Sequence, residues 1–429
     1  MRRTVSRGSF RFDLPLMVTA GYRALSHANN ETATPRPSRF PTLKQVRNLD
    51  ALLEIKRAEH NLPAVTALTL SDGAIAAKGE TGLRKTGTSV VVRPGDRWHI
   101  GGCAKAMTAT LIGALVEEGA LTWETTIGAA LPTLKNSILP AYHNVTLEML
   151  LTHRAGIPKG YEAPDAWRYT WKREGTPVQH RHKVSALMLR NAPLHTPGKS
   201  YAYSTMGYCI AGHMAEKITG YPWESLIQDL VFEPLGMNSA GPGPEQNCQQ
   251  IASPWGHQRE GTPIEPGVCA DQPAAFSPGG GSLHISMTDW SKFVAEHLKG
   301  AKGENGQLLS ADTYARLHSW QPTRPHSDSS PSNHLQSVKN SDGYAMGWQV
   351  CQRHWANNHP NETGTCLSHH GTILSWHSQV LMAPERNMAV LCATNIGDRN
   401  RGHAVSISEK LNDVAWAVIK EALAAQPAV

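Results

Sequence analysis

A lysine follows a pair of glycines at the start of an apolar stretch, in the run GGCAK at residues 101–105. Residues three apart share one face of a helix, so a hydroxyl at position 102 would stand beside the amine of Lys105. An amine in that place takes the proton of the hydroxyl and makes it a nucleophile for acyl transfer. Here position 102 is Gly102, and no serine in the chain has a lysine three residues after it.

Four further motifs follow this run in order: LLTHRAGIP at 150–158, YST at 203–205, FEPLGM at 232–237 and HHGT at 369–372. Each motif alone is weak, whereas the ordered set is specific. The set resembles the serine β-lactamase and penicillin-binding-protein superfamily, whose signature is Ser-x-x-Lys at a helix N-terminus. It is most similar to the class C-like and family VIII esterase-like branch, over roughly residues 45–420.

The resemblance implies a serine hydrolase that forms and hydrolyses an acyl-enzyme. Its partner would be a small-molecule or peptidoglycan-like acyl substrate: a β-lactam, a small ester or a D-amino-acid peptide. No cofactor and no metal are implied. Because Gly102 occupies the nucleophile position, we expect very low activity, since losing the nucleophile typically leaves about 10³–10⁴-fold catalysis over water.

The resemblance also assigns catalytic roles. Gly102 would supply the nucleophile position and an oxyanion-binding N–H, at a helix N-terminus that favours negative charge. Lys105 and Tyr203 would share the proton transfer, with the tyrosine as a general base. His369 would orient the leaving group or a substrate carboxylate. The plain alternatives are an ordinary half-buried tyrosine and a surface-strand histidine.

Three further residues would bind the substrate. Gly371 lets a substrate backbone approach the strand, and the N–H of Thr372 would be the second oxyanion donor. Thr205 stands where the superfamily has asparagine. A threonine hydroxyl donates one hydrogen bond but does not offer the donor and acceptor of an amide together, so this second departure weakens substrate recognition.

Two alternatives to the hydrolase scaffold stay open. One is a catalytically inactive binding homologue, which the second departure at Thr205 favours. The other is cysteine catalysis by Cys103, since a thiolate near a helix N-terminus is activated. Cys103 lies about 100° around the helix from position 102, so its sulfur should point away from Lys105. We therefore predict a packed small hydrophobe at this position.

The hydrophobic pattern predicts the elements that position these residues. An α+β fold follows, with an antiparallel β-sheet flanked by N- and C-terminal helices and a large, mostly helical inserted subdomain. The expected helices are 43–60, 102–118, 147–152, 207–218, 222–231, 286–298 and 406–424, and the expected strands are 64–70, 74–78, 344–351, 366–368, 375–382 and 388–394. Ser286 or Thr288 is expected to cap the helix at 286–298.

The expected organisation is one large domain after an N-terminal leader. A basic start, a short apolar segment and a small-residue exit predict a signal peptide, with an unstructured cytosolic tail as the alternative. The protein would then be periplasmic or secreted, and otherwise cytoplasmic. The expected segments are a signal peptide at 1–28, a linker at 29–42 and a β-lactamase-like domain at 43–425. Within this domain, the sheet subdomain is expected to span about 43–100 and 340–425, and the helical subdomain about 101–339.

Composition excludes other classes. The net charge of +6 forms no dense basic stripe, so we expect no nucleic-acid partner, and no run is apolar enough for a membrane span. His180 and His182 lack the further ligands of a metallo-hydrolase, so no catalytic metal is expected. Seven cysteines leave at least one thiol free. After export, one disulfide could join Cys248 to Cys269 and another Cys351 to Cys366. We expect Cys209 and Cys392 to be buried as small hydrophobic residues.

Overall fold

A nine-stranded sheet forms the centre of the fold, and both ends of the described chain contribute strands to it. The computed structural model describes residues 46–172, 174–243, 251–266, 273–323, 343–359, 361–373, 375–398 and 406–425. The expected signal peptide and linker therefore lie outside the described residues.

The strand order in the sheet is β1-β3-β2-β12-β11-β10-β9-β8-β7, and every neighbouring pair is antiparallel except β1 with β3. The strands are β1 (Arg47–Asn48), β2 (Ala64–Ser71), β3 (Ala74–Gly82), β7 (Gln321–Pro322), β8 (Gly343–Tyr344), β9 (Gln349–Arg353), β10 (Gly364–Ile373), β11 (Trp376–Ala383) and β12 (Met388–Thr394). A small second sheet has the order β4-β6-β5, with β4 (Arg97–His99), β5 (Gly241–Pro242) and β6 (Leu283–Ser286).

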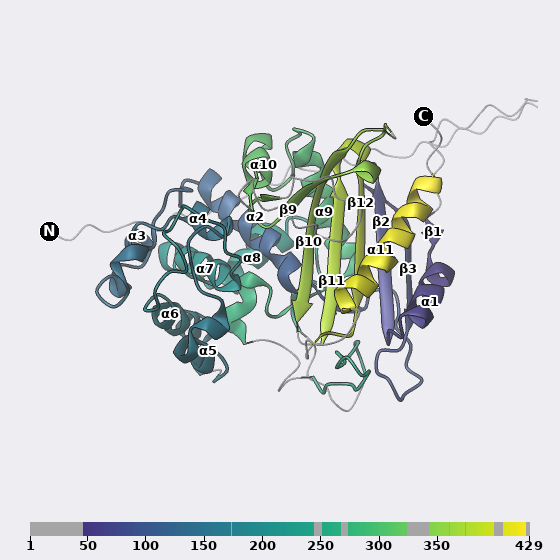
Figure 1. The fold of residues 1–429 in the computed structure, drawn as a ribbon, viewed down its shortest axis with the longest axis horizontal. Helices are drawn as coiled ribbons and strands as arrows, with labels where there is room; N and C mark the ends of the chain where they lie inside the picture. Colours follow the sequence, from purple (N-terminus) through teal and green to yellow (C-terminus); the bar gives the residue numbers. More distant parts are fainter. Residues whose placement is uncertain are drawn as a thin grey trace, which may run out of the picture. The chain divides into compact units, whose positions relative to one another are not determined.

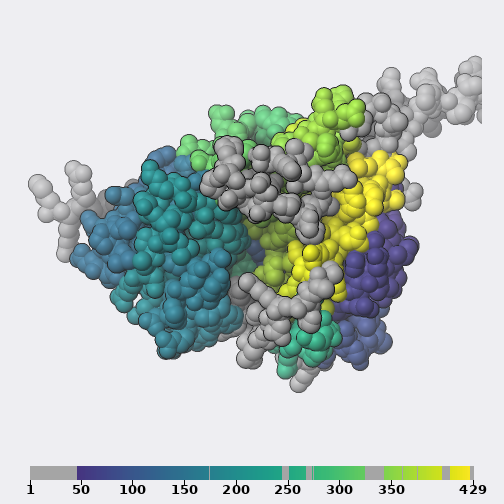
Figure 2. Space-filling model, viewed as in Figure 1, coloured from purple at the N-terminus to yellow at the C-terminus, as the bar shows by residue number. Residues whose placement is uncertain are grey.

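Helices cover both faces of the large sheet. The first helix α1 (Asp50–Glu59) and the last helix α11 (Ile407–Ala424) pack together on one face, as Figures 1 and 2 show in purple and yellow. Helix α9 (Met287–Ala301) packs on β2 and β12. All residues of β11 and β12 are buried, and β12 is accordingly almost continuously apolar rather than alternating, whereas β11 also buries His377, Ser378 and Gln379.

A mostly helical region lies beside the sheet (Figure 1), as the sequence pattern predicts. Its helices are α2 (Ala104–Glu117), α3 (Ile127–Ala130), α4 (Leu147–Leu151), α5 (Pro164–Thr170), α6 (Pro177–Met188), α7 (Thr205–Thr219), α8 (Trp223–Ile227) and α10 (Ala311–His318). A π-helical turn, Gln228–Phe232, extends α8. The predicted α+β architecture is confirmed. None of the helices in the described part of the chain is long and apolar enough to cross a membrane.

Some element boundaries differ from the prediction. The first helix begins only at Asp50, because Arg47–Asn48 pairs with β3 as a parallel strand. The strand expected at 344–351 is split into β8 and β9 around Gly347, whose φ of 88° is a turn conformation. The strand expected at 366–368 extends over 364–373, and Ser286 rather than Thr288 caps α9 by accepting the N–H of Asp289 at 3.2 Å.

The cysteines of the described chain form no disulfide. Cys351 and Cys366 face each other across β9 and β10 as buried thiols, and the Cys351 thiol lies 3.6 Å from the carbonyl oxygen of Cys366, so the disulfide expected between them is not present. Cys209 and Cys392 are buried as predicted. The other expected pair, 248/269, lies outside the described residues.

Candidate active site

A short 3₁₀ turn, η1 (Gly101–Cys103), continues directly into α2 and places Gly102 and Lys105 on one side of it. A Cβ atom at Gly102 would lie 3.3 Å from the hydroxyl of Tyr203 and 3.0 Å from Cε1 of His369. A side chain at position 102 would therefore point directly at the residues that the sequence motifs assign to catalysis.

Lys105 lies at the bottom of this group, with 1% of its surface exposed. Its ammonium donates a hydrogen bond of 2.7 Å to the carbonyl of Gly279, in the 3₁₀ segment η6 (Ala274–Gly279). The same ammonium lies 5.1 Å from the centre of the Tyr203 ring. The structure thus brings the predicted lysine and tyrosine together, with the positive charge facing an aromatic ring.

Tyr203 and Thr205 flank the start of α7. Tyr203 is partly exposed and belongs to the loop that enters the helix, whereas Thr205 is the first helical residue. The methyl group of Thr205 lies against Gly279, the residue that accepts the Lys105 hydrogen bond. The predicted Tyr-x-Thr element therefore lies at the same site as Lys105.

Strand β10 supplies the opposite side. Strand β9 pairs with it only as far as Ser368. Beyond that residue η1 lies against β10: a Cβ at Gly101 would be 2.9 Å from the N of Thr372, and a Cβ at Gly371 would collide with the carbonyl of Ile100. Glycine at both positions allows this close approach of two backbones. Thr372 is exposed at the rim, where its N–H was predicted to bind an oxyanion.

His369 is held as a neutral ring. One ring nitrogen accepts the O–H of Tyr344 at 3.1 Å, and the other donates to the carbonyl of His370 at 2.7 Å. Burial, with a contribution from the positive charge of Lys105, lowers the pKa of His369 to about 3. Both nitrogens are bonded within the protein, and the carbon Cε1 is the part of the ring that faces position 102.

Two site residues were missed by the sequence-based assignment, His153 and Tyr344. The ring of His153 is buried, with centre-to-centre distances of 4.3 Å to Tyr203 and 4.6 Å to Tyr344. Its backbone is left-handed (φ 58°), which is uncommon outside glycine. Burial and then the charge of Lys105 keep the pKa of His153 well below its ordinary value. His153 does belong to the LLTHRAGIP motif, whereas no sequence pattern pointed to Tyr344.

Cys103 points away from the site, as predicted. Its sulfur lies 3.3 Å from the carbonyl of His369 and 3.6 Å from the hydroxyl of Ser378, on the sheet side of η1. Burial raises the pKa of the thiol to about 12. A raised pKa makes the thiol a poorer nucleophile near neutral pH, because the reactive form is the thiolate.

Elsewhere in the described chain, three side chains could together hold a metal ion: those of Glu59, His60 and Asp413. Their possible ligand atoms lie within 4.8 Å of one another. The ammonium of Lys56 already lies 2.8 Å from Glu59 and 2.7 Å from Asp413. A lysine ammonium therefore already supplies the positive charge that a metal would bring.

Several known proteins resemble this chain in sequence. Residues 48–411 match the Beta-lactamase family. Penicillin-binding protein 4 of Amycolatopsis lactamdurans is 28% identical over 264 residues, covering 61% of this chain and 66% of the relative. Protein flp of Staphylococcus aureus (strain MW2) is 22% identical over 371 residues, covering 85% of this chain and 66% of the relative. This chain thus spans just under two thirds of the length of these relatives.

Solved structures share the fold. The octameric penicillin-binding protein homologue from Pyrococcus abyssi superposes with a TM-score of 0.65 at 21% identity, covering 88% of this chain and 77% of that one. A D-stereospecific amidohydrolase from Streptomyces sp. gives a TM-score of 0.60 at 19% identity, covering 85% and 96%. With the family match over residues 48–411, the chain belongs to the serine β-lactamase and penicillin-binding-protein superfamily of hydrolases.

Proposed function

We propose that this chain carries the acyl-transfer site of a serine hydrolase without its nucleophile, and that it turns over acyl substrates very slowly as a result. The observation that carries the proposal is the direction of a side chain at Gly102, which would lie within 3.3 Å of the Tyr203 hydroxyl. Lys105 follows three residues later, on the same face and beside the same ring.

A serine at position 102 would complete a recognisable reaction. Its hydroxyl oxygen would attack the acyl carbon while Tyr203 and Lys105 take the proton and pass it to the leaving group. The N–H groups of residue 102 and Thr372 would hold the oxyanion. Water would then hydrolyse the ester and release a carboxylic acid.

The first test is intact-protein mass spectrometry of the parent chain, Gly102→Ser and Gly102→Ala. Each is exposed to a chromogenic cephalosporin, a p-nitrophenyl ester and a D-amino-acid amide, the last because a structural neighbour is a D-stereospecific amidohydrolase. We expect an acyl adduct on Gly102→Ser alone, and turnover at least about 10³-fold above the parent chain. The alanine variant is the matched control, since it adds the same Cβ without the hydroxyl.

Two results would contradict the proposal. An adduct on the parent chain would mean that another residue attacks. A well-folded Gly102→Ser that reacts with none of the three substrate classes would mean that the site does not support acyl transfer.

A second function, that of a binding homologue without catalysis, is favoured by a specific observation. The carbonyl of His370 lies only 2.9 Å from the position of a Cβ at Gly102, closer than a real Cβ atom is found, so β10 or η1 must shift slightly to admit serine. Together with Thr205, this suggests a site that has adjusted to glycine. Reactivity that returns only in Gly102→Ser/Thr205→Asn, and not in Gly102→Ser, would support this second function.

A further inference from the structure

The candidate site holds a buried positive charge for which the described chain supplies no carboxylate. Lys105 is 1% exposed, and its one hydrogen bond in the described structure goes to the carbonyl of Gly279. Its charge is felt by its neighbours, since it helps to lower the pKa values of His153 and His369. A buried ion is costly unless it is paired, so this arrangement calls for an anion from outside the described chain.

A second buried donor belongs to His153, whose ring centre lies 4.3 Å from that of Tyr203. Nδ1 of His153 accepts the N–H of Ser204 at 3.2 Å, so in the neutral ring the proton is on Nε2. That Nε2–H is buried and has no acceptor among the described residues. A buried donor without an acceptor is unfavourable, and an incoming acceptor would satisfy it.

The remaining groups at the site also offer donors or are already used. The hydroxyl of Tyr203 faces position 102, and the N–H of Thr372 lies on the part of β10 beyond its pairing with β9. His369 offers nothing further, because Tyr344 and His370 occupy its two nitrogens. Gly102 and Tyr203 are partly exposed and Thr372 is exposed, so these three residues form the solvent-facing side above Lys105.

We infer that this site binds a carboxylate reversibly, with the anion between the Lys105 ammonium and the Tyr203 hydroxyl. The ligand class is the free carboxylic acid that acyl hydrolysis would release, held without a covalent bond. This inference rests on the proposed function for its ligand class. The missing serine hydroxyl is what leaves Lys105 without a polar partner at position 102.

The test compares phenylacetate with phenylacetamide, which have nearly the same shape and differ in charge. Binding to the full parent chain is measured by NMR titration. We expect phenylacetate to bind at least about tenfold more tightly, because hydrogen bonds to charged groups are the stronger ones. Lys105→Met should remove this preference, and Tyr203→Phe should reduce it without changing the binding of the amide.

Lys292→Met is the matched control. The ammonium of Lys292 also donates to a glycine carbonyl, that of Gly236, but it has the carboxylate of Asp289 at 2.7 Å. This variant should keep the preference for phenylacetate. If Lys105→Met does not fold, as judged by circular dichroism, Tyr203→Phe carries the test.

Equal binding of the two probes, no binding of either, or a preference that survives both site variants would overturn the inference. Failure of this inference can be told apart from failure of the proposed function. Carboxylate binding is measured on the parent chain, whereas acyl transfer is tested by adducts on Gly102→Ser.

Discussion

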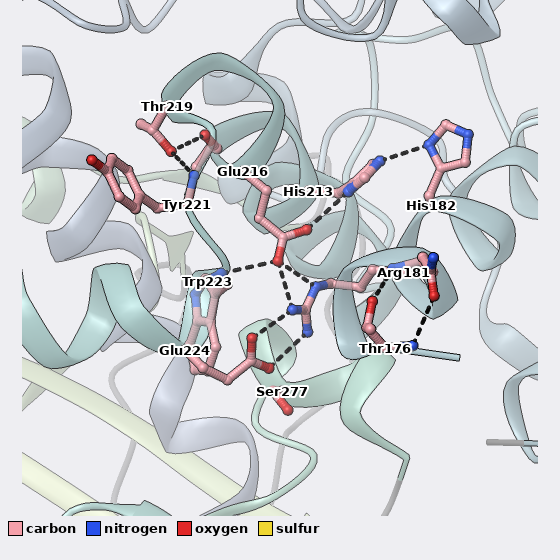
Figure 3. Close-up of polar contacts among 12 residues, drawn as sticks. Thr176, Arg181, His182, His213, Glu216, Thr219, Tyr221, Trp223, Glu224 and Ser277 are labelled. Atoms are coloured by element: carbon pink, nitrogen blue, oxygen red, sulfur yellow. Dashed lines mark hydrogen bonds and ion pairs between the residues drawn. The ribbon is translucent and has the colours of Figure 1, made fainter. Parts of the chain in front are cut away.

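Two buried cations in this protein have opposite surroundings. Arg181 on α6 is fully buried, and its guanidinium bonds to two carboxylates, Glu216 at 2.6 Å and Glu224 at 2.8 Å (Figure 3). Lys105 on α2 is equally buried and bonds to one backbone carbonyl. Helix α7 is close to both, since it carries Glu216 near its end and Thr205 at its start.

The network around Arg181 continues beyond the ion pairs. Glu216 also accepts the ring N–H of His213 at 2.9 Å and the backbone N–H of Trp223 at 2.9 Å, and His213 pairs with His182 at 3.0 Å (Figure 3). Such a network holds α6, α7 and α8 together. The comparison teaches that a satisfied buried charge is part of the framework, whereas an unsatisfied one marks a place for a ligand or a reaction.

The largest expected effect is a difference in the stability of the protein when each of the two cations is replaced by methionine. Arg181→Met leaves Glu216 without its buried guanidinium partner, so we expect a loss of about 3–5 kcal/mol in the free energy of unfolding. Lys105→Met removes an uncompensated charge and should change that energy by about 1 kcal/mol or less, or increase it. Urea unfolding followed by circular dichroism measures both variants.

Arg168→Met is the control for this comparison. Arg168 pairs with Asp165, and both side chains are more than three-quarters exposed, at 77% and 79%. An exposed pair contributes at most about 1 kcal/mol. Equal losses in Arg181→Met and Lys105→Met would mean that the two cations do not differ in the way described.

A smaller effect concerns the response of the site to acid. The pKa of His369 is about 3 in the folded chain and near the ordinary histidine value of 6.5 when the chain is unfolded. Between these values the unfolded chain binds one more proton at this residue, so the free energy of unfolding falls as the pH drops below 6.5. In His369→Gln, the slope against pH should decrease by up to about 1.4 kcal/mol per unit, measured by urea unfolding at several pH values. An unchanged slope would contradict the buried neutral state of His369.

The smallest expected effect is at Cys103. Because burial raises its pKa to about 12, iodoacetamide should leave this thiol unmodified at pH 8 in the folded protein and modify it in urea. Peptide mass mapping distinguishes Cys103 from the other thiols. Fast modification of Cys103 in the folded chain would support the alternative hypothesis that Cys103 is the nucleophile.

Much of the fold was predictable because local pattern and tertiary contacts agree. The hairpin of β2 and β3 and the cap at Ser286 follow from nearby residues. The errors arise where a distant partner decides. Arg47–Asn48 becomes a strand only because β3 is available beside it, and β10 extends to Ile373 because β11 pairs with it along that length.

The residues of the candidate site likewise fall into those that local motifs predicted and one that depends on a distant partner. Motif order predicted that Lys105, Tyr203 and His369 belong together, and their proximity follows from the structure. Tyr344 escaped notice because its role depends on a hydrogen bond to His369, 25 residues away on a neighbouring part of the sheet. No local pattern encodes such a contact.

The sequence by itself determined that position 102 has no hydroxyl and that Lys105 follows at helical spacing, since both are facts of covalent order. Only the tertiary structure decided which buried cation receives a counter-charge. Arg181 meets its carboxylates across 35 and 43 residues, and Lys105 meets a carbonyl 174 residues away. Charge pairing acts through space and depends on distance and burial, so it is settled only when the chain has folded.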